Sequence, residues 1–390
     1  MTLLESTGFD WRIAFSAVSV VILAAAEYYA KLIPQGKRFG VISLISAGLI
    51  LTGVWMPSEL VRIILLSAAG LLLVCLIWPQ NQLAGRWFLA ASATGSLLVA
   101  GGLALSGMFS GALIEPAGII SKVVVCLVFI GYAVKLALLP FSLWLVSISE
   151  NCSVMSAVLV VSLLDMAEFG ELAALRVEVP WMFEQTLGVW IGLDVLCMLG
   201  GALLALAQTN VRRMLAYSTI DDMGYLILGL AAGSAGGVMG ALVGALSHAL
   251  CKFLLFGALG IAEHDLGHPL TTSDRGVSNR QPAASAAFIA GSLGMVGVPP
   301  LLGFIGRWRL YLGGMEMGGV WLAVLMASAT TLALLYYVRI IHKVWLGQIT
   351  EGPVTAPKRF RALEGILIGF IFLLVIGGFS PTIFAVLGGR

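Results

Sequence analysis

Long apolar stretches, each about as long as a membrane-spanning helix, recur along the whole chain and are separated by short polar segments. A helix needs about 20 apolar residues to cross a bilayer. Apart from closed barrels, only helices satisfy their backbone hydrogen bonds there. The pattern therefore predicts an all-α polytopic membrane protein. We expect about twelve spans, at roughly 11–33, 39–56, 59–78, 86–108, 117–146, 153–176, 182–206, 213–233, 236–262, 282–306, 318–345 and 361–387.

Two of these expected spans are interrupted by proline, and each interruption is accompanied by a cation. The segment GYAVKLALLPFSLWL places Lys135 before Pro140, and GMVGVPPLLGFIGRW places Pro299 and Pro300 before Arg307. Proline removes a backbone hydrogen bond and disfavours helix at the residue before it. In lipid the freed carbonyl groups need water or a polar side chain. We therefore expect a broken helix at each site, with a simple proline kink as the alternative.

The two breaks lie five spans apart, so the broken helices would cross the membrane in opposite directions. This spacing predicts two inverted five-helix repeats, over residues 39–176 and 182–345. Residues 1–38 would form a preceding transmembrane helix, and residues 346–390 a loop with a final one. Inverted repeats with discontinuous helices are typical of ion-transporting folds. The two halves share little residue identity, so this prediction rests on the positions of the breaks.

Composition supports a membrane protein and excludes several other classes. The chain is 59% hydrophobic and 11% charged, which no soluble globular domain matches, and its net charge of +2 gives no sign of nucleic-acid binding. The first apolar run lacks a preceding basic region, so we expect a retained span and not a cleaved signal. No phosphate-binding loop is present, and the cysteines are scattered singly, so we expect no cofactor and no metal. The cysteines are Cys75, Cys126, Cys152, Cys197 and Cys251.

Lysine and arginine residues gather at one set of expected span ends. Because cytoplasmic loops carry an excess of these residues, the ends where they gather are predicted to be cytoplasmic. Both termini would then lie on the non-cytoplasmic side. The residues concerned are Lys31, Lys37, Arg38, Arg86, Arg212, Arg213, Arg275, Arg280, Lys343, Lys358, Arg359 and Arg361.

The stretch Val243–Phe256, VGALSHALCKFLLF, is apolar enough to lie in a membrane, yet it contains His248 and Lys252. Positions i and i+4 share one face of a helix. Ionisable groups at bilayer depth are costly and are functional by default. We expect this stretch to be the centre around which the chain is organised. The pair is either a proton relay or a buried polar pair that locks helices together.

Further ionisable residues extend this candidate relay. Burial destabilises a charged lysine and a nearby carboxylate stabilises it, so a lysine whose acidic partner moves can bind and release a proton. Histidine can pass protons in either direction. Asp194 is either a relay partner or an acid that packs helices through hydrogen bonds to polar neighbours. The candidate line along the membrane midplane consists of Lys135, Asp165, Glu168, His248, Lys252 and Arg307, with Asp194 and Asp222 as further possible partners.

Several segments, taken in this order, resemble the antiporter-like subunits of respiratory complex I, which are shared with membrane-bound hydrogenases and with Mrp-type cation/proton antiporters. The resemblance covers roughly residues 85–390 and implies a multi-pass subunit of the bacterial or archaeal cytoplasmic membrane. The segments are VKLALLPFSLWL (134–145), ALAQTNVRRMLAYSTIDDMGYLILGL (205–230), LSHALCKFLLF (246–256), GMVGVPPLLGFIGRW (294–308) and LYYVRIIHKVWLG (335–347).

The resemblance implies roles for individual residues. Lys135 matches the proton-carrying lysine of the first broken helix, and His248 with Lys252 matches a central HAxxK pair. Arg307 stands where relatives have Lys or Glu. Arginine hardly releases its proton, so this residue would act as a fixed electrostatic barrier or gate.

Two further departures concern the first half of the chain. The run 59–78 has no acid between Arg62 and Trp78, where many relatives have a glutamate paired with the broken-helix lysine. Asp165 stands where relatives often have Lys. Either the nearby acids, which include Glu168, supply the missing partner of Lys135, or the first half-channel no longer conducts.

Three functions follow as hypotheses. The first is a proton-translocating subunit of a complex I-like or hydrogenase-type assembly, which would depend on partner subunits because the chain shows no redox site of its own. The second is a subunit of an Mrp-type sodium/proton antiporter or of an inorganic-carbon uptake complex. The third is a degenerate scaffold subunit that moves no ions. In each case the expected partners are other membrane subunits and the lipid bilayer, and the transported ion is a proton, with sodium as the alternative.

Overall fold

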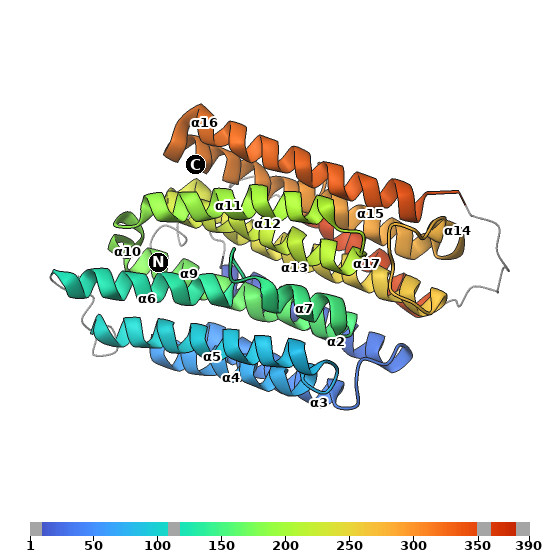
Figure 1. Cartoon of the computed structure of the whole chain (residues 1–390), viewed down its shortest axis with the longest axis horizontal. Coiled ribbons are helices and arrows are strands. Elements are labelled where there is room, and N and C mark those ends of the chain that lie inside the picture. Colours follow the sequence, from blue (N-terminus) through green and yellow to red (C-terminus); the bar gives the residue numbers. More distant parts are fainter. Residues whose placement is uncertain (1–9, 108–117, 349–359, 380–390) are drawn as a thin grey trace.

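The computed structural model describes residues 10–107, 118–348 and 360–379, and helices make up most of them (Figure 1). Within these ranges the β pairing is an isolated bridge between Asn210 and Thr271. The expected Lys358 and Arg359, and the end of the last expected span, lie outside the described residues. The helices are α2 (Trp11–Leu32), α3 (Phe39–Trp55), α4 (Glu59–Ile77), α5 (Gln82–Leu105), α6 (Ile119–Lys135), α7 (Leu143–Asn151), α8 (Val154–Val158), the π-helical η2 (Leu159–Leu164), α9 (Asp165–Glu178), α10 (Pro180–Glu184), α11 (Leu187–Ala207), α12 (Val211–Ala232), α13 (Ala235–Leu266), α14 (Val277–Arg280), α15 (Pro282–Val296), α16 (Leu302–Ile340), the π-helical η3 (Ile341–Trp345) and α17 (Arg361–Gly378).

The prediction of an all-helical membrane protein is confirmed at this level. Among the described residues, seven helical segments are long and apolar enough to cross a membrane, by length and composition: α2, α4, α5, α11, α13, α17 and the continuous Leu302–Trp345. The helices α3 and α15 are apolar but shorter. The long helices run side by side along one direction, as transmembrane helices do (Figure 1).

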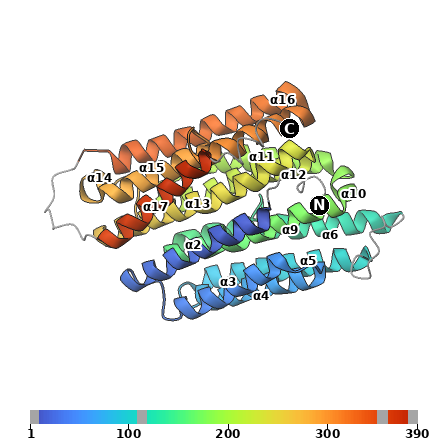
Figure 2. The same cartoon turned by 180° about the vertical axis from the view of Figure 1, so that it is seen from behind.

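Helix α13 lies at the centre of the fold. Figures 1 and 2 show α3 to α7 on one side and α15 and α16 on the other, with α13 between them. It packs against α2, α8, η2 and α9, and also against α12, α15, α16 and α17. In the apolar part of α13, 94% of the residues are buried inside the protein. In the other candidate spans, at most 50% of the residues are buried. The stretch Val243–Phe256 is therefore the structural centre that the sequence predicted.

Glycines allow α13 to approach α16 closely. A Cβ atom added to Gly306 would lie 2.8 Å from the backbone Cα and N of Gly244, and one added to Gly240 would lie 3.0 Å from the N of Leu310. In a membrane, helix association depends on close packing, because lipid tails are as apolar as the side chains they replace. These glycines therefore bring α16, with Arg307, against the face of α13.

Both expected helix breaks are present, and a side chain serves a freed carbonyl group at each. Helix α6 ends at Lys135 and α7 begins at Leu143, while α15 ends at Val296 and α16 begins at Leu302. At the first break the indole Nε1 of Trp144 donates to the carbonyl of Val134 at 3.0 Å. At the second, Nη2 of Arg307 donates to the carbonyl of Met295 at 2.7 Å. The prediction that polar groups satisfy the broken backbone holds for these two carbonyls.

Some boundaries differ from the expected ones. Residues 302–306, expected to end one span, and residues 307–317, expected to lie between two spans, form the first part of α16, which is separated from its second part at Gly319, where φ is 62° and ψ is −159°. Glycine tolerates this positive φ because it has no Cβ atom. The expected span 153–176 contains the π-helical turn η2 immediately before Asp165. Apolar periodicity does not reveal either feature, because both are local changes of backbone geometry.

The Gly306 contact yields a stability prediction. Replacing Gly306 by Ala places a Cβ 2.8 Å from the backbone of α13, so we expect Gly306→Ala to destabilise the protein by about 1–3 kcal/mol through overpacking. The matched control is Gly192→Ala in α11, where an added Cβ meets no atom within 4 Å. Thermal unfolding of the two variants in detergent measures the difference. Equal melting temperatures would contradict the packing proposed for α13 and α16.

Candidate functional site

Most of the ionisable residues singled out from the sequence form two buried groups, one in each half of the chain. The first group comes from α6 and α9, and the second from α12, α13 and α16. The residues Lys135, Asp165, Glu168, Asp194, Asp222, His248, Lys252 and Arg307 are all buried, none more than 8% exposed.

Lys135 lies between two glutamates of α9. Its Nζ is 3.2 Å from Oε1 of Glu168 and 3.8 Å from Oε2 of Glu171, and no side chain of the three is more than 5% exposed. The glutamates are three residues apart and so share one helix face. Space for the lysine is provided by Gly95 of α5, where an added Cβ would lie 2.5 Å from Cγ of Lys135. Helix α9 therefore supplies the acidic partner that the run 59–78 lacks.

Among the described residues, the buried carboxyl groups of Asp165 and Asp194 have no hydrogen-bond partner. Both carboxylate oxygens of each residue lack a partner among the residues that the structure describes. Asp165 follows η2 and makes no ion pair with Lys135 in this part of the chain. For Asp194, the expected hydrogen bonds to polar neighbours are not found there. A buried carboxyl group in this situation is stable only when it is neutral or reached by water.

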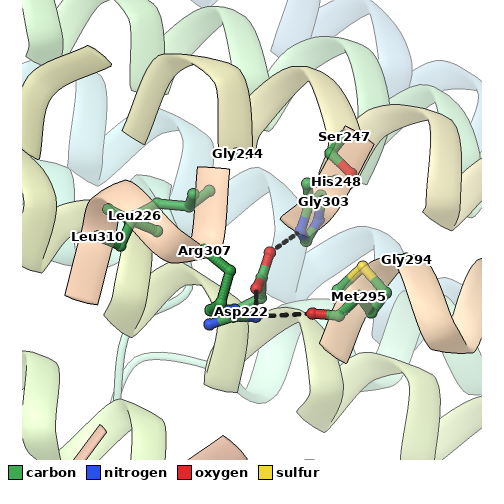
Figure 3. Close-up of a pocket in the computed structure, with 10 residues that line it drawn as sticks. All are labelled: Asp222, Leu226, Gly244, Ser247, His248, Gly294, Met295, Gly303, Arg307 and Leu310. Carbon is green, nitrogen blue, oxygen red and sulfur yellow. Dashed lines mark hydrogen bonds and ion pairs between the residues drawn. The ribbon is translucent and has the colours of Figure 1, made fainter. Parts of the chain in front are cut away.

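The second group is centred on Asp222 of α12. Figure 3 shows its carboxylate lying between Arg307 and His248. Its Oδ1 accepts a hydrogen bond from Nη2 of Arg307 at 2.6 Å, and its Oδ2 lies 2.7 Å from Nδ1 of His248. The guanidinium of Arg307 also stacks over the ring of Tyr225, with Cζ 3.7 Å from the ring centroid. Arg307 is therefore fixed from three sides, by an acid, a carbonyl group and an aromatic face.

Lys252 is buried, and its hydrogen-bond partners are neutral groups. Its Nζ donates to the carbonyl oxygen of Leu215 at 3.0 Å and to Oγ of Ser218 at 2.7 Å. Both partners belong to α12, as does Asp222, the partner of His248. The i, i+4 pair on α13 thus faces α12 along one stripe, as the spacing predicted. Next to Asp222, Oδ2 of Asp221 accepts a hydrogen bond from the hydroxyl of Tyr336 at 3.0 Å.

A small cavity adjoins the second group. It has a volume of about 10 Å³ and is bordered by Asp222, His248, Arg307 and Ser247, with backbone and apolar side chains completing it (Figure 3). About 10–15 Å³ is enough for one water molecule. Nε2 of His248 and Nη1 of Arg307 have no hydrogen-bond partner among the described residues. The cavity therefore suits a single water molecule beside the histidine and the arginine.

Two contributors were not predicted from the sequence. Ser218 and Tyr225 flank Asp222 on α12, at positions i−4 and i+3, and hold Lys252 and Arg307 respectively. Helical spacing alone would have placed both residues on the face of Asp222. Serine and tyrosine are uncharged and do not stand out in an apolar helix. Only their helical spacing from Asp222 could have indicated these two residues.

Comparisons with known proteins agree with this geometry. Residues 57–333, more than half of the chain, match the family described as NADH:quinone oxidoreductase/Mrp antiporter, TM. NADH-quinone oxidoreductase subunit N of Desulforudis audaxviator is 33% identical over 282 residues, which cover 67% of this chain and 56% of that protein. The chain thus matches about half the length of this curated relative.

Solved structures show the same fold. A chain of the Mrp complex from Dietzia sp. superposes with a TM-score of 0.88 at 18% identity, covering 98% of this chain and 83% of that one. A chain of the archaeal membrane-bound sulfane sulfur reductase superposes with a TM-score of 0.82 at 22% identity, covering 96% and 81%. The chain is a multi-pass membrane protein and belongs to the NADH:quinone oxidoreductase/Mrp antiporter membrane-subunit family.

Proposed function

We propose that this protein is the proton-translocating, antiporter-like membrane subunit of a complex I-like assembly. The observation that carries the proposal is Lys135, which lies fully buried at a helix break with two glutamates within 3.8 Å. Support comes from the curated relative, which is a subunit of NADH-quinone oxidoreductase. Energy would come from partner subunits, and the partners would be other membrane subunits of the same assembly.

In the first half, Lys135, Glu168 and Glu171 form a protonatable unit. Two carboxyl groups face one ammonium. The three groups together are electrically neutral only when one of the carboxyl groups is protonated. The carboxylate that lies nearer stabilises the ammonium, and its withdrawal favours release of the proton. A small displacement of α9 relative to α6 would change both distances together. Asp165, which precedes Glu168 on α9, adds another protonatable carboxyl group.

In the second half, Lys252 and His248 are the groups that exchange protons. Lys252 has only neutral partners within hydrogen-bonding distance, which favours loss of its proton. His248 shares Asp222 with Arg307, and the arginine keeps its charge. Arg307 therefore holds one oxygen of Asp222 permanently and acts as a fixed barrier at the end of this half. Asp194 of α11, whose carboxylate oxygens have no hydrogen-bond partner among the described residues, is a further protonatable site.

Two other candidates are each favoured by one observation. An Mrp-type antiporter subunit is favoured by the TM-score of 0.88 with a chain of the Mrp complex from Dietzia sp.. A scaffold subunit that moves no ions is favoured by the closed ion pair of Arg307 and Asp222. Purifying the native complex through a tag on this chain, and identifying the subunits that accompany it, separates a redox-driven complex from an antiporter or an inorganic-carbon uptake complex.

We also propose about twelve spans, arranged as two inverted five-helix units, with both termini on the non-cytoplasmic side. The two breaks support the repeat, because each interrupts an expected span at a proline and has a cation beside it, Lys135 at the first and Arg307 at the second. The clustering of Lys and Arg at one set of helix ends supports the orientation.

The lysines provide the main test. We expect Lys135→Met and Lys252→Met each to lower proton translocation by the assembled complex at least about tenfold, because each removes a proton-carrying group. Lys122→Met is the control, since Lys122 is exposed at the start of α6. Proton movement per turnover is measured in liposomes that contain the native complex. Parental translocation in both buried-lysine variants, with normal assembly, would exclude the proposal.

The Asp222 site provides a second test. Breaking a buried ion pair on one side leaves an unpaired charge and costs about 3–5 kcal/mol. We therefore expect Arg307→Met to destabilise the complex more than the double variant Asp222→Asn with Arg307→Met. Arg309→Met is the control, because Arg309 is only half-buried on the same helix and forms no ion pair among the described residues. Thermal unfolding ranks the variants, and a double variant destabilised as much as Arg307→Met, or more, would show that the two residues are not coupled.

The orientation can be tested with reporter fusions. We expect alkaline phosphatase to be active, and green fluorescent protein to be dark, when fused to the C-terminus, because that end is proposed to be non-cytoplasmic. Fusions after truncation in the segment between α11 and α12 should show the reverse. Fluorescence at the C-terminus would reverse the proposed orientation.

A further inference from the structure

We propose that Tyr225 is a positioning residue, whose ring keeps Arg307 fixed as the barrier to protons in the second half. A chain of hydroxyl groups, which continues through Thr330 to Tyr311, holds this ring in place. The inference rests on the proposed function and adds to it the means by which the arginine is immobilised. Thr330 and Tyr311 lie outside the ion pair that Arg307 forms with Asp222.

The ring of Tyr225 covers one face of the guanidinium group of Arg307. Cζ of Arg307 lies 3.7 Å from the ring centroid, and Tyr225 is fully buried. A guanidinium group is attracted to an aromatic face, and the attraction is largest where water is excluded. The hydrogen bonds to Oδ1 of Asp222 and to the carbonyl of Met295 both come from Nη2. They restrain the group at one nitrogen, whereas the ring restrains its whole face.

The hydroxyl group of Tyr225 is anchored on the second part of α16. It donates to the carbonyl oxygen of Met326 at 2.7 Å and lies 2.8 Å from Oγ1 of Thr330. Oγ1 of Thr330 in turn lies 2.7 Å from the hydroxyl oxygen of Tyr311. A hydroxyl group has one proton to donate. Tyr225 gives its proton to the carbonyl of Met326, so Thr330 donates to Tyr225. Tyr311 then donates to Thr330, which completes the chain.

Thr330 differs from its neighbours in the use of its hydroxyl group. Ser328 and Thr331 each donate to the carbonyl oxygen four residues earlier in their own helix. This bond is common for serine and threonine inside a helix. The carbonyl oxygen at this distance from Thr330 is that of Met326, which accepts from Tyr225. Oγ1 of Thr330 instead joins the two tyrosines.

The chain joins three helical segments around Arg307. Tyr225 belongs to α12, Tyr311 to the first part of α16 and Thr330 to its second part. Arg307 and Tyr311 are four residues apart and share one face of their helix. On α12, Asp222 and Tyr225 are three residues apart and share one face as well. The ion pair and the hydroxyl chain therefore restrain the segment that carries Arg307 at two neighbouring turns.

A fixed arginine obstructs protons, because its charge repels them and it hardly releases its own. Arg307 borders a cavity of about 10 Å³, which is about the space that one water molecule needs. Without the ring of Tyr225, the vacated space would let the guanidinium group move and would admit further water beside it. Protons could then pass along this water. The ring thus prevents protons from leaking back past this end of the second half.

The test measures the passive proton permeability of liposomes that contain the native complex, in the absence of turnover. We expect Tyr225→Leu to raise this permeability at least about thirtyfold, because it removes a desolvated contact between a cation and an aromatic face. Tyr225→Phe keeps the face and removes the hydroxyl anchor, so we expect a rise of only about fivefold. Tyr217→Leu is the control and should leave permeability unchanged. Tyr217 is a half-buried tyrosine of the same helix and stacks on no cation among the described residues.

A purely structural role would give a different result, because it would lower assembly, turnover and proton movement together without raising permeability in the assembled complex. Parental permeability in assembled Tyr225→Leu would overturn the inference. So would a rise with Tyr225→Phe, or with Tyr217→Leu, as large as that with Tyr225→Leu. If Tyr225→Leu does not assemble, Tyr225→Phe decides, and parental permeability in that variant excludes the anchoring role of the hydroxyl chain.

The lysine variants separate this inference from the proposed function. If Lys135→Met and Lys252→Met stop translocation while Tyr225→Leu leaves permeability unchanged, the positioning role is excluded and the proposed function stands. If both lysine variants translocate protons as the parent does while Tyr225→Leu raises permeability, the proposed function fails although the ring of Tyr225 still closes a path for protons.

Discussion

The cost of burying a charge is the constraint on which this structure depends. A buried ammonium, guanidinium or carboxylate is stable only with a partner, a proton or water. The chain meets this requirement differently in its two halves. In the first half, Lys135 faces more carboxyl groups than it can neutralise, which leaves a proton to be exchanged. In the second half, Asp222 is held by Arg307, which leaves Lys252 with neutral partners.

The two helix breaks explain this asymmetry. At the first break a neutral indole, that of Trp144, serves the carbonyl group of Val134, so Lys135 is free to face α9. At the second break the cation itself, Arg307, serves the carbonyl group of Met295 and is tied to the backbone. Each helix break frees a carbonyl group. At the first break this group is bonded by a neutral side chain, and at the second it is bonded by the cation of that break. This difference suits an exchanging group in one half and a fixed charge in the other.

Helix α13 gives the two halves a common support. Its glycines admit α16 to close contact, while its opposite side receives α8, η2 and α9. At one end, Arg212 of α12 forms a bidentate ion pair with Glu263 of α13 and donates to the carbonyl group of Cys152, which lies between α7 and α8. A polar bridge therefore fastens the first half to the second, in addition to the close packing of their helices.

The sequence by itself determined the class of fold, the central position of Val243–Phe256 and both helix breaks. It also determined which ionisable residues would be buried. These features follow from local chemistry: apolar length, proline and the i, i+4 spacing of His248 and Lys252 act within one segment. Tertiary structure decided the partners. Glu171 joins Lys135, Tyr225 stacks on Arg307, and the carboxyl groups of Asp165 and Asp194 receive no hydrogen bond among the described residues. Each of these outcomes depends on the rotation and depth of one helix against another. That geometry is set by packing between segments far apart in the chain, which no local pattern encodes.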